Sequence, residues 1–452
     1  MPVFAPEFLA RAASGQWTGE PARELTGFGI DTRSLRSGDV FVALKTATRD
    51  GHDFLSAAES AGAAAAIVSR ADPSISLPQL VVLDPLSAFQ AIAAAHRRTF
   101  AGPVIGISGS AGKTSTKNLL ALLLSSAPGE VLATEGNLNN HLGVPLTLIR
   151  LDASAHRVAV IEAGIGGPGE MAPLAAMIAP DLAIITLIGP AHLEALGSLE
   201  GVAREKCVLP EATRSGGWKI FPASCCAYAP FRALPDPVLA LAPAVSHTSA
   251  ATRIRFSMTP VGDELEFACR RVSDGMASNA ALALAAALHL GVSAAEAQAR
   301  LSLWQPAALR GELRRDAAGR WLYVDCYNAN PASMHDALAV FSDLAAAESP
   351  RLYVIGGMEE LGADSERYHR ELGVALAAWL RPADTALVLA ASPAAEAVVA
   401  GAASSAVTAA RDLAQVRAVF ESFSGAVFIK GSRRYHLESL LVPVGDVTGP
   451  AH

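Results

Sequence analysis

The stretch GISGSAGKTSTK, residues 106–117, combines a glycine turn with a lysine and a threonine, as phosphate-binding loops do. Apolar residues before it predict a strand and the residues after it predict a helix, so N–H groups at the helix N-terminus would converge on one spot. There Lys113 would pair with the β- and γ-phosphates of a nucleotide, and Thr114 would ligate Mg²⁺. The spacing differs from G-x-x-x-x-G-K-[ST], because Ile107 stands where the first glycine would fall. The alternative is an ordinary strand–helix turn with a solvated lysine, but the Lys-Thr pair in this context favours phosphate.

A carboxylate and an imidazole follow two further predicted strands. The apolar runs 156–164 and 181–189 are typical of strands buried in a parallel sheet, with Glu162 near the end of the first and His192 just after the second. Ligands bind at the carboxyl ends of such strands. Either residue alone is as often a structural hydrogen-bonding group. With a phosphate loop on the same edge, Mg²⁺ ligation is the better explanation.

Three other polar features have a structural explanation when each is considered alone. Residues 134–148, TEGNLNNHLGVPLTL, hold three asparagines that could serve only turn conformations. Residues 324–334, VDCYNANPASM, place Asp325 at a strand tip, where acidic residues often hold ribose hydroxyls, but the segment also fits a plain strand–helix connection. Lys206 lies on a helix that we expect Ser198 to cap, and local sequence predicts no more than a surface lysine.

Alternating strands and helices predict three α/β units. A small mixed unit comprises residues 1–101 and ends near Gly102-Pro103, which would interrupt a helix and start a new connection. A central unit, residues 102–312, reads as a doubly wound sheet that carries the phosphate loop. Four further strands separated by helices predict a third α/β unit, residues 313–452.

Composition limits the class of protein. At 452 residues and 51% hydrophobic side chains, the chain is long enough for two or three cores. The net charge of −7 makes nucleic acid a poor partner. The five cysteines, with Cys225 and Cys226 adjacent, fit neither a disulfide framework nor a C-x-x-C metal site, so we expect a reducing cytoplasm. No long uncharged apolar run occurs and the first residues lack a basic region, so neither membrane insertion nor export is expected.

Together these segments resemble the Mur ligases of peptidoglycan synthesis along essentially the whole chain. The family loop T-G-[ST]-x-G-K-[ST] is similar to SGSAGKT, residues 108–114. Further matching motifs are GNLNNHLGVPLTL, GSLEGVAREK, DCYNANPASM, EELGADSERYH and KGSR, and IDTRSLRSGDVFVAL with DGHDF resembles the uridine-nucleotide domain. The YNAN motif is most similar to the branch that adds a dipeptide. The resemblance implies a nucleotide-sugar domain, a central ATPase domain and a C-terminal Rossmann-like domain.

The implied reaction is ATP-dependent amide formation between UDP-N-acetylmuramoyl-tripeptide and D-alanyl-D-alanine through an acyl phosphate. The resemblance implies catalytic roles for Lys113, Lys206 and His192, and two Mg²⁺ ions bound by Thr114, Glu162, His192 and a carbamylated Lys206. It implies ATP contacts from Gly109, Gly112, Lys113, Thr114, Ser115, Asn279, Arg310 and Asp325. It implies substrate contacts from Thr32, Arg33, Asn137, Asn139, Asn140, Asn328, Asn330, Ser333 and Lys430. Family members are commonly monomeric, so a monomer is expected.

The sequence departs from the family pattern at three places. Gly166-Gly167 replaces a polar pair, Gly275-Met276 replaces the His-Asn ahead of the NAALA helix, and Gly357 replaces an Asp before M-x-E-L-G. The groups for ATP phosphate and metal are retained. Their retention predicts a working enzyme, and the departures predict altered recognition. Because the family's adenine-contacting Asn is lost, adenine would be held by packing or by another residue.

Three alternative functions remain at this point. A sister ligase that adds a single amino acid would carry D-N-P-R in its last domain, and this chain lacks that motif. A nucleotide-dependent binding protein with impaired ligation would not need Glu162, His192 and Lys206. A phosphoryl-transfer kinase would form ADP without dependence on a dipeptide. The third residue of the accepted peptide, diaminopimelate or lysine, has no readable code in the sequence.

Overall fold

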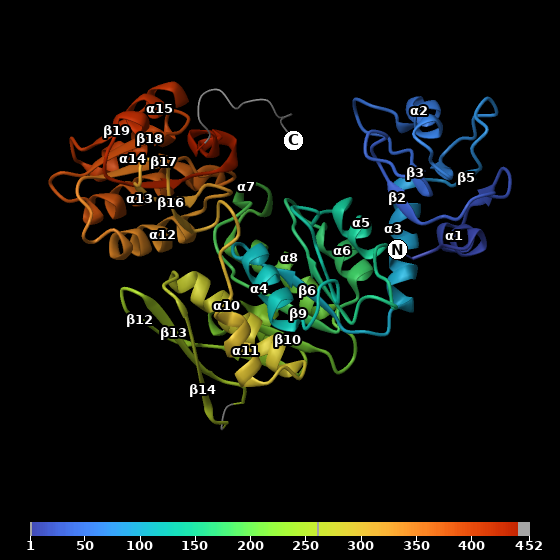
Figure 1. Cartoon of the computed structure of the whole chain (residues 1–452), viewed down its shortest axis with the longest axis horizontal. Helices are drawn as coiled ribbons and strands as arrows, with labels where there is room; N and C mark the ends of the chain where they lie inside the picture. Colours follow the sequence, from blue (N-terminus) through green and yellow to red (C-terminus); the bar gives the residue numbers. More distant parts are fainter. Residues whose placement is uncertain (1, 260–261, 442–452) are drawn as a thin grey trace.

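The computed structural model describes residues 2–259 and 262–441, which form three α/β units (Figure 1). The N-terminal unit is built on β1–β5, the central unit on β6–β11 with β12–β14, and the C-terminal unit on β15–β20. The N-terminal and C-terminal units lie on opposite sides of the central unit (Figure 1). The expected α/β class with parallel sheets is confirmed. Within the described ranges, no helix is both long and apolar enough to span a bilayer.

The N-terminal sheet has the strand order β1-β5-β4-β3-β2, with β1 antiparallel to β5 and the other pairs parallel. Helix α3, Pro85–Thr99, begins after Asp84, whose side chain accepts a hydrogen bond from Ser87 N. The predicted strands at 39–44 and 77–83 are confirmed, though each is shorter than its apolar run. The strands are β1 (Gln16–Trp17), β2 (Gly27–Gly29), β3 (Asp39–Val42), β4 (Ala65–Val68) and β5 (Gln79–Val81), and the other helices are α1 (Pro6–Ala13), η1 (Gly51–Phe54) and α2 (Leu55–Ser60).

The central sheet is six-stranded and parallel throughout, in the order β11-β10-β9-β6-β8-β7. Helices α4 and α10 pack together on one face, and α6 and α8 pack together on the other, so the sheet is doubly wound as predicted. The strands are β6 (Val104–Ser108), β7 (Val131–Ala133), β8 (Val158–Glu162), β9 (Leu182–Ile185), β10 (Trp218–Pro222) and β11 (Val238–Leu241). The helices are α4 (Lys113–Leu124), α5 (Gly143–Leu148), α6 (Met171–Ile178), α7 (Leu193–Leu196), α8 (Leu199–Glu211), η2 (Ala223–Ala227), α9 (Ala229–Arg232), α10 (Asp274–His289) and α11 (Ala294–Leu301).

A second, antiparallel sheet in the central unit was not anticipated. It consists of β12 (Ala244–His247), β13 (Ala251–Ser257) and β14 (Glu264–Arg270), and it packs against α10 and α11. Buried and exposed residues alternate along β13 and β14. That period of two, visible in ATRIRFS and ELEFACR, is the signal that could have identified the hairpin.

The C-terminal sheet has the order β15-β16-β20-β17-β18-β19, in which only β15 is antiparallel to its neighbour. The four predicted strands are present, but the short strands β15 and β19 add one at each edge. The strands are β15 (Glu312–Arg315), β16 (Trp321–Asp325), β17 (Arg351–Gly356), β18 (Thr385–Leu389), β19 (Val407–Ala409) and β20 (Ala426–Lys430). The helices are α12 (Pro331–Leu344), η3 (Gly362–Asp364), α13 (Ser365–Trp379), α14 (Ala394–Ala402), α15 (Leu413–Ser422), η4 (Arg433–Tyr435) and η5 (Leu437–Leu441).

One hydrophobic cluster, which we call the shared core, joins the N-terminal and central units. It contains Phe4, Phe28 and Phe89 from the first unit together with Val144 and Met171 from the second. Helix α3 packs against α1 on one side and against α5 and α6 on the other. The two units therefore bury apolar surface against each other as well as within themselves.

Arg97 on α3 forms hydrogen bonds across the junction between the N-terminal and central units. Its guanidinium is fully buried and donates to Ile178 O at 2.9 Å, Ala179 O at 3.0 Å and Asp181 Oδ2 at 2.8 Å. Burial lowers the pKa of Arg97 to about 10, although the Asp181 charge opposes that shift. The side chain is still charged at neutral pH, so its partners hold a buried cation in place.

Replacing Arg97 by leucine is expected to lower the free energy of unfolding by about 3 kcal/mol, because buried carbonyls and Asp181 lose their charged partner. Urea unfolding followed by circular dichroism measures this change. Arg98→Leu is the matched control, because Arg98 is the exposed neighbour on the same helix. Equal, small effects of the two substitutions would show that the buried network does not hold the junction.

Candidate active site

The loop between β6 and α4 has the form that phosphate binding needs. Gly109 and Gly112 have φ values of 146° and 83°, which L side chains rarely adopt. A Cβ on Gly109 would lie 2.0 Å from Thr186 Oγ1, and a Cβ on Gly112 would lie 2.2 Å from Asn279 Nδ2. Both glycines therefore allow close packing, and Gly112 is the N-cap of α4, whose first N–H groups face the cavity described below.

A cavity of about 770 Å³ lies over this loop, between the central and C-terminal units. Its walls come from the carboxyl ends of β6, β8 and β9, from the start of α10 and from the segment around β16. Of the predicted site residues it is lined by Gly112, Lys113, Thr114, Ser115, Asn137, Asn139, Asn140, Glu162, His192, Asn279, Arg310, Asp325, Asn328, Asn330, Ser333 and Lys430. Residues far apart in the sequence thus meet at the sheet edge where the strand pattern placed them.

Lys113 lies at the floor of the cavity. Its Nζ donates to Gly109 O at 2.8 Å, so the side chain folds back over the loop. Desolvation lowers its pKa, the Glu162 charge acts in the opposite direction, and Arg310 lowers it further. The lysine and Arg310 therefore share one cavity, and their mutual repulsion is a reason for an anion to bind between them.

Glu162 is the centre of a polar cluster at the end of β8. Its Oε1 accepts hydrogen bonds from Asn139 Nδ2 at 2.8 Å and from Thr114 Oγ1 at 3.2 Å. Its Oε2 has no hydrogen-bond partner, although Lys117 Nζ lies 3.9 Å away and donates to Thr134 O. A buried carboxylate oxygen without a hydrogen bond is available to a cation. The structure therefore fits Mg²⁺ at this carboxylate.

Lys117 was not identified from the sequence as a site residue. It lies one helical turn after Lys113, on the same face of α4, and that spacing of four is the signal that could have found it. The two side chains diverge, because Lys113 donates to Gly109 O while Lys117 lies against Glu162. Lys117 Nζ lies 3.9 Å from Glu162 Oε2, so it places a second cationic group beside the carboxylate.

Lys206 is fully buried on α8, and its Nζ has no hydrogen-bond partner. Ser198 caps the helix by accepting from Gly201 N at 3.1 Å, as predicted. Burial holds the pKa of Lys206 well below its usual range, and the Lys113 charge lowers it further. The expectation of a surface lysine from local sequence alone is wrong. A lowered pKa favours the neutral amine, which is the form that reacts with CO₂, so the environment fits the carbamylation that the family resemblance implies.

His192 lies just before α7 with a φ of 55°, and its Nδ1 contacts the Glu360 carboxylate from the C-terminal unit. Sequence reasoning did not link these two residues, because 168 positions separate them. The hydrogen bond to His192 lowers the pKa of Glu360, despite the opposing desolvation. No group of three or more His, Cys, Asp or Glu side chains suited to a metal occurs in residues 2–259 and 262–441. A metal here would need the Thr114 hydroxyl and a modified Lys206 as well.

The wall opposite the phosphate loop carries Asp325, expected at the ribose, with Lys430, expected at the substrate, and Arg310, expected at the ATP phosphate, lies beside them. Asp325, the last residue of β16, forms an ion pair with Lys430 at 2.6 Å. The Arg310 guanidinium stacks 3.9 Å above the Tyr327 ring. Asp325 and Lys430 were predicted for different ligands, but the structure shows that they act as one charged pair.

Several predicted substrate residues also support the local fold. Asn330 and Ser333 form a reciprocal capping box at the start of α12. The Asn140 side chain accepts from Leu142 N and Gly143 N, and the Asn328 side chain accepts from Ala329 N. These residues line the cavity while their side-chain oxygens satisfy backbone N–H groups, so the structural explanation considered from the sequence is correct for part of their role.

The structure explains two of the three departures from the family pattern. A Cβ on Gly357 would lie 2.6 Å from the Tyr435 hydroxyl, so that tyrosine fills the space of a side chain at this position. A Cβ on Gly275 would lie 2.6 Å from Asp336 Oδ2, and Gly275 N donates to the same carboxylate at 3.2 Å. By contrast, no atom within 4 Å would contact a Cβ on Gly166.

The residues expected at the nucleotide-sugar end lie in the N-terminal unit, away from the cavity. Thr32 and Arg33 are absent from its lining, and Arg33 forms an exposed ion pair with Asp31 at 2.6 Å. Gly109 and Lys206 also do not line it. The structure thus separates the predicted residues into those that line the cavity, those in the N-terminal unit, and Gly109 and Lys206, which lie in the central unit outside the cavity lining.

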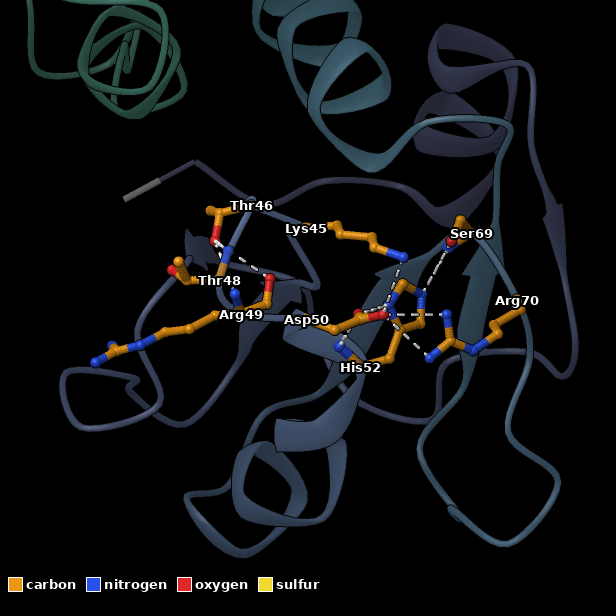
Figure 2. A network of polar contacts seen from close by, with 8 residues as sticks. All are labelled: Lys45, Thr46, Thr48, Arg49, Asp50, His52, Ser69 and Arg70. Atoms are coloured by element: carbon orange, nitrogen blue, oxygen red, sulfur yellow. Dashed lines mark hydrogen bonds and ion pairs between the residues drawn. The ribbon is translucent and has the colours of Figure 1, made fainter.

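Asp50 of the DGHDF motif is the centre of a separate polar network in the N-terminal unit (Figure 2). Its carboxylate accepts from His52 N at 3.0 Å, contacts His52 Nδ1 at 2.6 Å and binds Arg70 at 3.2 Å. The other ring nitrogen of His52 accepts from Ser69 N at 2.9 Å. The hydrogen bonds from His52 hold the pKa of Asp50 well below its usual range. The motif therefore ties the loop after β3 to the end of β4.

Comparisons with known proteins agree with this arrangement. Family models match as "Mur ligase family, catalytic domain" over residues 24–97, "Mur ligase middle domain" over 107–287 and "Mur ligase, glutamate ligase domain" over 309–433. The UDP-N-acetylmuramoyl-tripeptide--D-alanyl-D-alanine ligases of Escherichia coli and Bacillus subtilis are 36% and 31% identical to this chain. The Escherichia coli match covers 76% of this chain and 77% of the relative, and the Bacillus subtilis match covers 77% of each.

Solved structures match over nearly the full length. A crystal structure of MurF from Acinetobacter baumannii superposes with a TM-score of 0.85 at 29% identity, covering 97% of this chain and 98% of the other. MurF from Thermotoga maritima in complex with ADP gives a TM-score of 0.78 at 24% identity, covering 92% and 96%, and supports the fold alone. The motifs, the three units and these matches agree, and the chain belongs to the Mur ligase family.

Proposed function

We propose that this chain uses ATP to join D-alanyl-D-alanine to UDP-N-acetylmuramoyl-tripeptide, in the synthesis of the peptidoglycan precursor. The observation that carries the proposal is the cavity in which Lys113, Thr114 and Glu162 of the central unit face Asp325 and Lys430 of the C-terminal unit. The names of the relatives above support the choice of substrates. The retained YNAN segment supports a dipeptide over a single amino acid.

In this proposal the central unit binds and orients the triphosphate. The N-terminus of α4 and Lys113 hold the phosphates, and Asp325 with Lys430 holds the ribose side. Mg²⁺, bound by Thr114, Glu162, His192 and carbamylated Lys206, would supply charge neutralisation at the transferred phosphoryl group. The orphaned Glu162 Oε2 and the unpartnered Lys206 Nζ support this ligand set.

The reaction would proceed in two displacements. The terminal carboxylate of the tripeptide attacks the γ-phosphorus, which gives an acyl phosphate and ADP. The dipeptide amine then attacks the acyl carbon, and phosphate leaves with the bonding electron pair. Lys113 and Arg310 oppose the negative charge on the phosphoryl group. Enclosure of the cavity by the C-terminal unit would keep water from the acyl phosphate.

Each of the three units would bind a different substrate. Residues 1–101 would bind the uridine nucleotide through Thr32 and Arg33, residues 102–312 the ATP, and residues 313–452 the dipeptide through Asn328, Asn330 and Ser333. We propose a monomeric enzyme of the cytoplasm with two Mg²⁺ ions. Asn137, Asn139 and Asn140 would lie at the junction with the muramoyl peptide.

Phosphate release tests the proposed reaction. With Mg²⁺ and ATP, we expect release only when both UDP-N-acetylmuramoyl-tripeptide and D-alanyl-D-alanine are present, and mass spectrometry should show the pentapeptide product. Release that does not depend on the dipeptide would contradict ligation and indicate a kinase. Product formed with a single amino acid in its place would indicate a sister ligase, and no release would indicate a binding relative.

A further inference from the structure

His192 is contacted from another unit of the protein. It precedes α7 in the central unit, whereas Glu360 lies between β17 and η3 in the C-terminal unit. Nδ1 of His192 contacts Oε2 of Glu360, and Glu194 N lies 3.5 Å from Glu360 O. Beyond them, a Cβ on Gly362 would lie 3.2 Å from Glu194 Cα. Side chain and backbone therefore both join the two segments.

Both residues of the contact have an unusual backbone conformation. Glu360 has a φ of 62° and His192 a φ of 55°, in the left-handed region that only a few per cent of residues other than glycine occupy, although histidine is among the more frequent of them. Such conformations cost of order 1–3 kcal/mol each and persist where the surroundings determine them. Two of them at one contact suggest that the orientation of these side chains is itself needed.

The two residues before Glu360 are held by hydrogen bonds within the C-terminal unit. Its neighbour Glu359 accepts from Tyr435 Oη at 2.6 Å and from Arg434 Nη1 at 2.9 Å. Met358 N donates to Nε2 of the buried His369 at 3.0 Å. The Tyr435 hydroxyl occupies the space that a side chain at position 357 would need. Gly357, where the family has an aspartate, thus leaves room for the Tyr435 hydroxyl, which holds Glu359. Glu360, the residue after Glu359, contacts His192.

We propose that Glu360 is a positioning residue for His192, supplied by the C-terminal unit when it lies against the central unit. Its carboxylate accepts a hydrogen bond from His192 Nδ1–H, and the proton stays on Nδ1, so Nε2 is the imidazole nitrogen available to a divalent cation. Metal-binding histidines usually donate their other N–H to such a partner, and loss of the partner weakens metal binding by 10–100-fold. The inference rests on the proposed role of His192 as a metal ligand.

The experiment uses Mn²⁺ with ADP as a spectroscopic probe for the full-length protein. Mn²⁺ binding is titrated by electron paramagnetic resonance, and spin-echo modulation detects an imidazole nitrogen bound to Mn²⁺. We expect Glu360→Ala to raise the Kd for Mn²⁺ about tenfold and to weaken the nitrogen modulation. Glu360→Gln keeps the length and one acceptor oxygen, so a smaller rise is expected.

Two further variants separate this inference from the proposed function. Glu366→Gln is the matched control, because it removes an exposed charge from the start of α13 in the same unit and should leave the Kd unchanged. If His192→Ala weakens Mn²⁺ binding but both Glu360 variants bind as the wild type does, the positioning role is overturned and the ligand assignment stands. If His192→Ala leaves both the Kd and the nitrogen modulation unchanged, the ligand assignment and this inference are both overturned.

Discussion

Lys113→Ala should lower kcat by about 10³-fold, the loss typical of removing one preorganised charge at a developing anion. The reason is the position of Nζ, which lies above the phosphate loop and 2.8 Å from Gly109 O. In its proposed role that lysine would contact the phosphates of bound ATP as well as of the transition state, so ATP affinity should fall too, by about tenfold for one charged hydrogen bond. Phosphate release under saturating substrates and calorimetric titration with ATP measure the two effects.

The control for Lys113→Ala lies on the same helix. Asn118 is exposed on α4, and Asn118→Ala should leave both kcat and the melting temperature unchanged. Lys113→Arg keeps the charge but carries it on a larger planar group, so we expect a partial loss. If Lys113→Ala retains most of the activity, the loop does not stabilise the transferred phosphoryl group.

Lys206→Met should abolish ligation and at the same time stabilise the fold. Methionine has a similar length and no polar head, so it removes a buried amine that has no hydrogen-bond partner. Relief of that unsatisfied group is worth about 1–3 kcal/mol. Activity should be lost because methionine cannot be carbamylated. Denaturant unfolding in CO₂-free buffer and the phosphate-release assay measure the two effects.

The stabilisation by Lys206→Met should depend on pH. Burial holds the pKa of Lys206 in the folded chain well below the ordinary lysine value of 10.5. Between those two values the unfolded wild-type chain binds a proton that the folded chain does not, so wild-type stability rises with pH by up to about 1.4 kcal/mol per unit. The methionine variant lacks this term, so its advantage should shrink as the pH approaches 10.5. An advantage that is constant with pH would show that Lys206 is charged in the folded chain.

Sequence reasoning predicted the parts of the site that depend on local pattern. The apolar strands that end at Ser108 and Glu162, followed by polar loops, determined which residues would meet at the sheet edge, and the structure places them there. The cap at Ser198 was equally readable, because one side chain accepts a hydrogen bond three residues along the chain. Each of these features depends on neighbours within a few positions.

Contacts between units could not be predicted in the same way. Whether Glu360 meets His192, or Asp336 meets Gly275, depends on how separate sheets pack, and a single sequence carries no period or spacing for that. The burial of Lys206 is of the same kind, since its helix pattern alone indicated an exposed residue. The antiparallel sheet β12–β14 is different, because its alternating pattern was present in the sequence and was missed.

The shared core determines which units of the molecule unfold together. Phe28 and Phe89 pack in the same cluster as Val144 and Met171, and Arg97 is bound to carbonyls across the junction. Loss of either side would expose apolar surface on the other, so the N-terminal and central units should melt in one cooperative transition. The C-terminal sheet has separate clusters of its own and can melt independently. Calorimetry should therefore resolve two transitions for three units, and a movement that widened the cavity between the central and C-terminal units would be a movement of the smaller cooperative block.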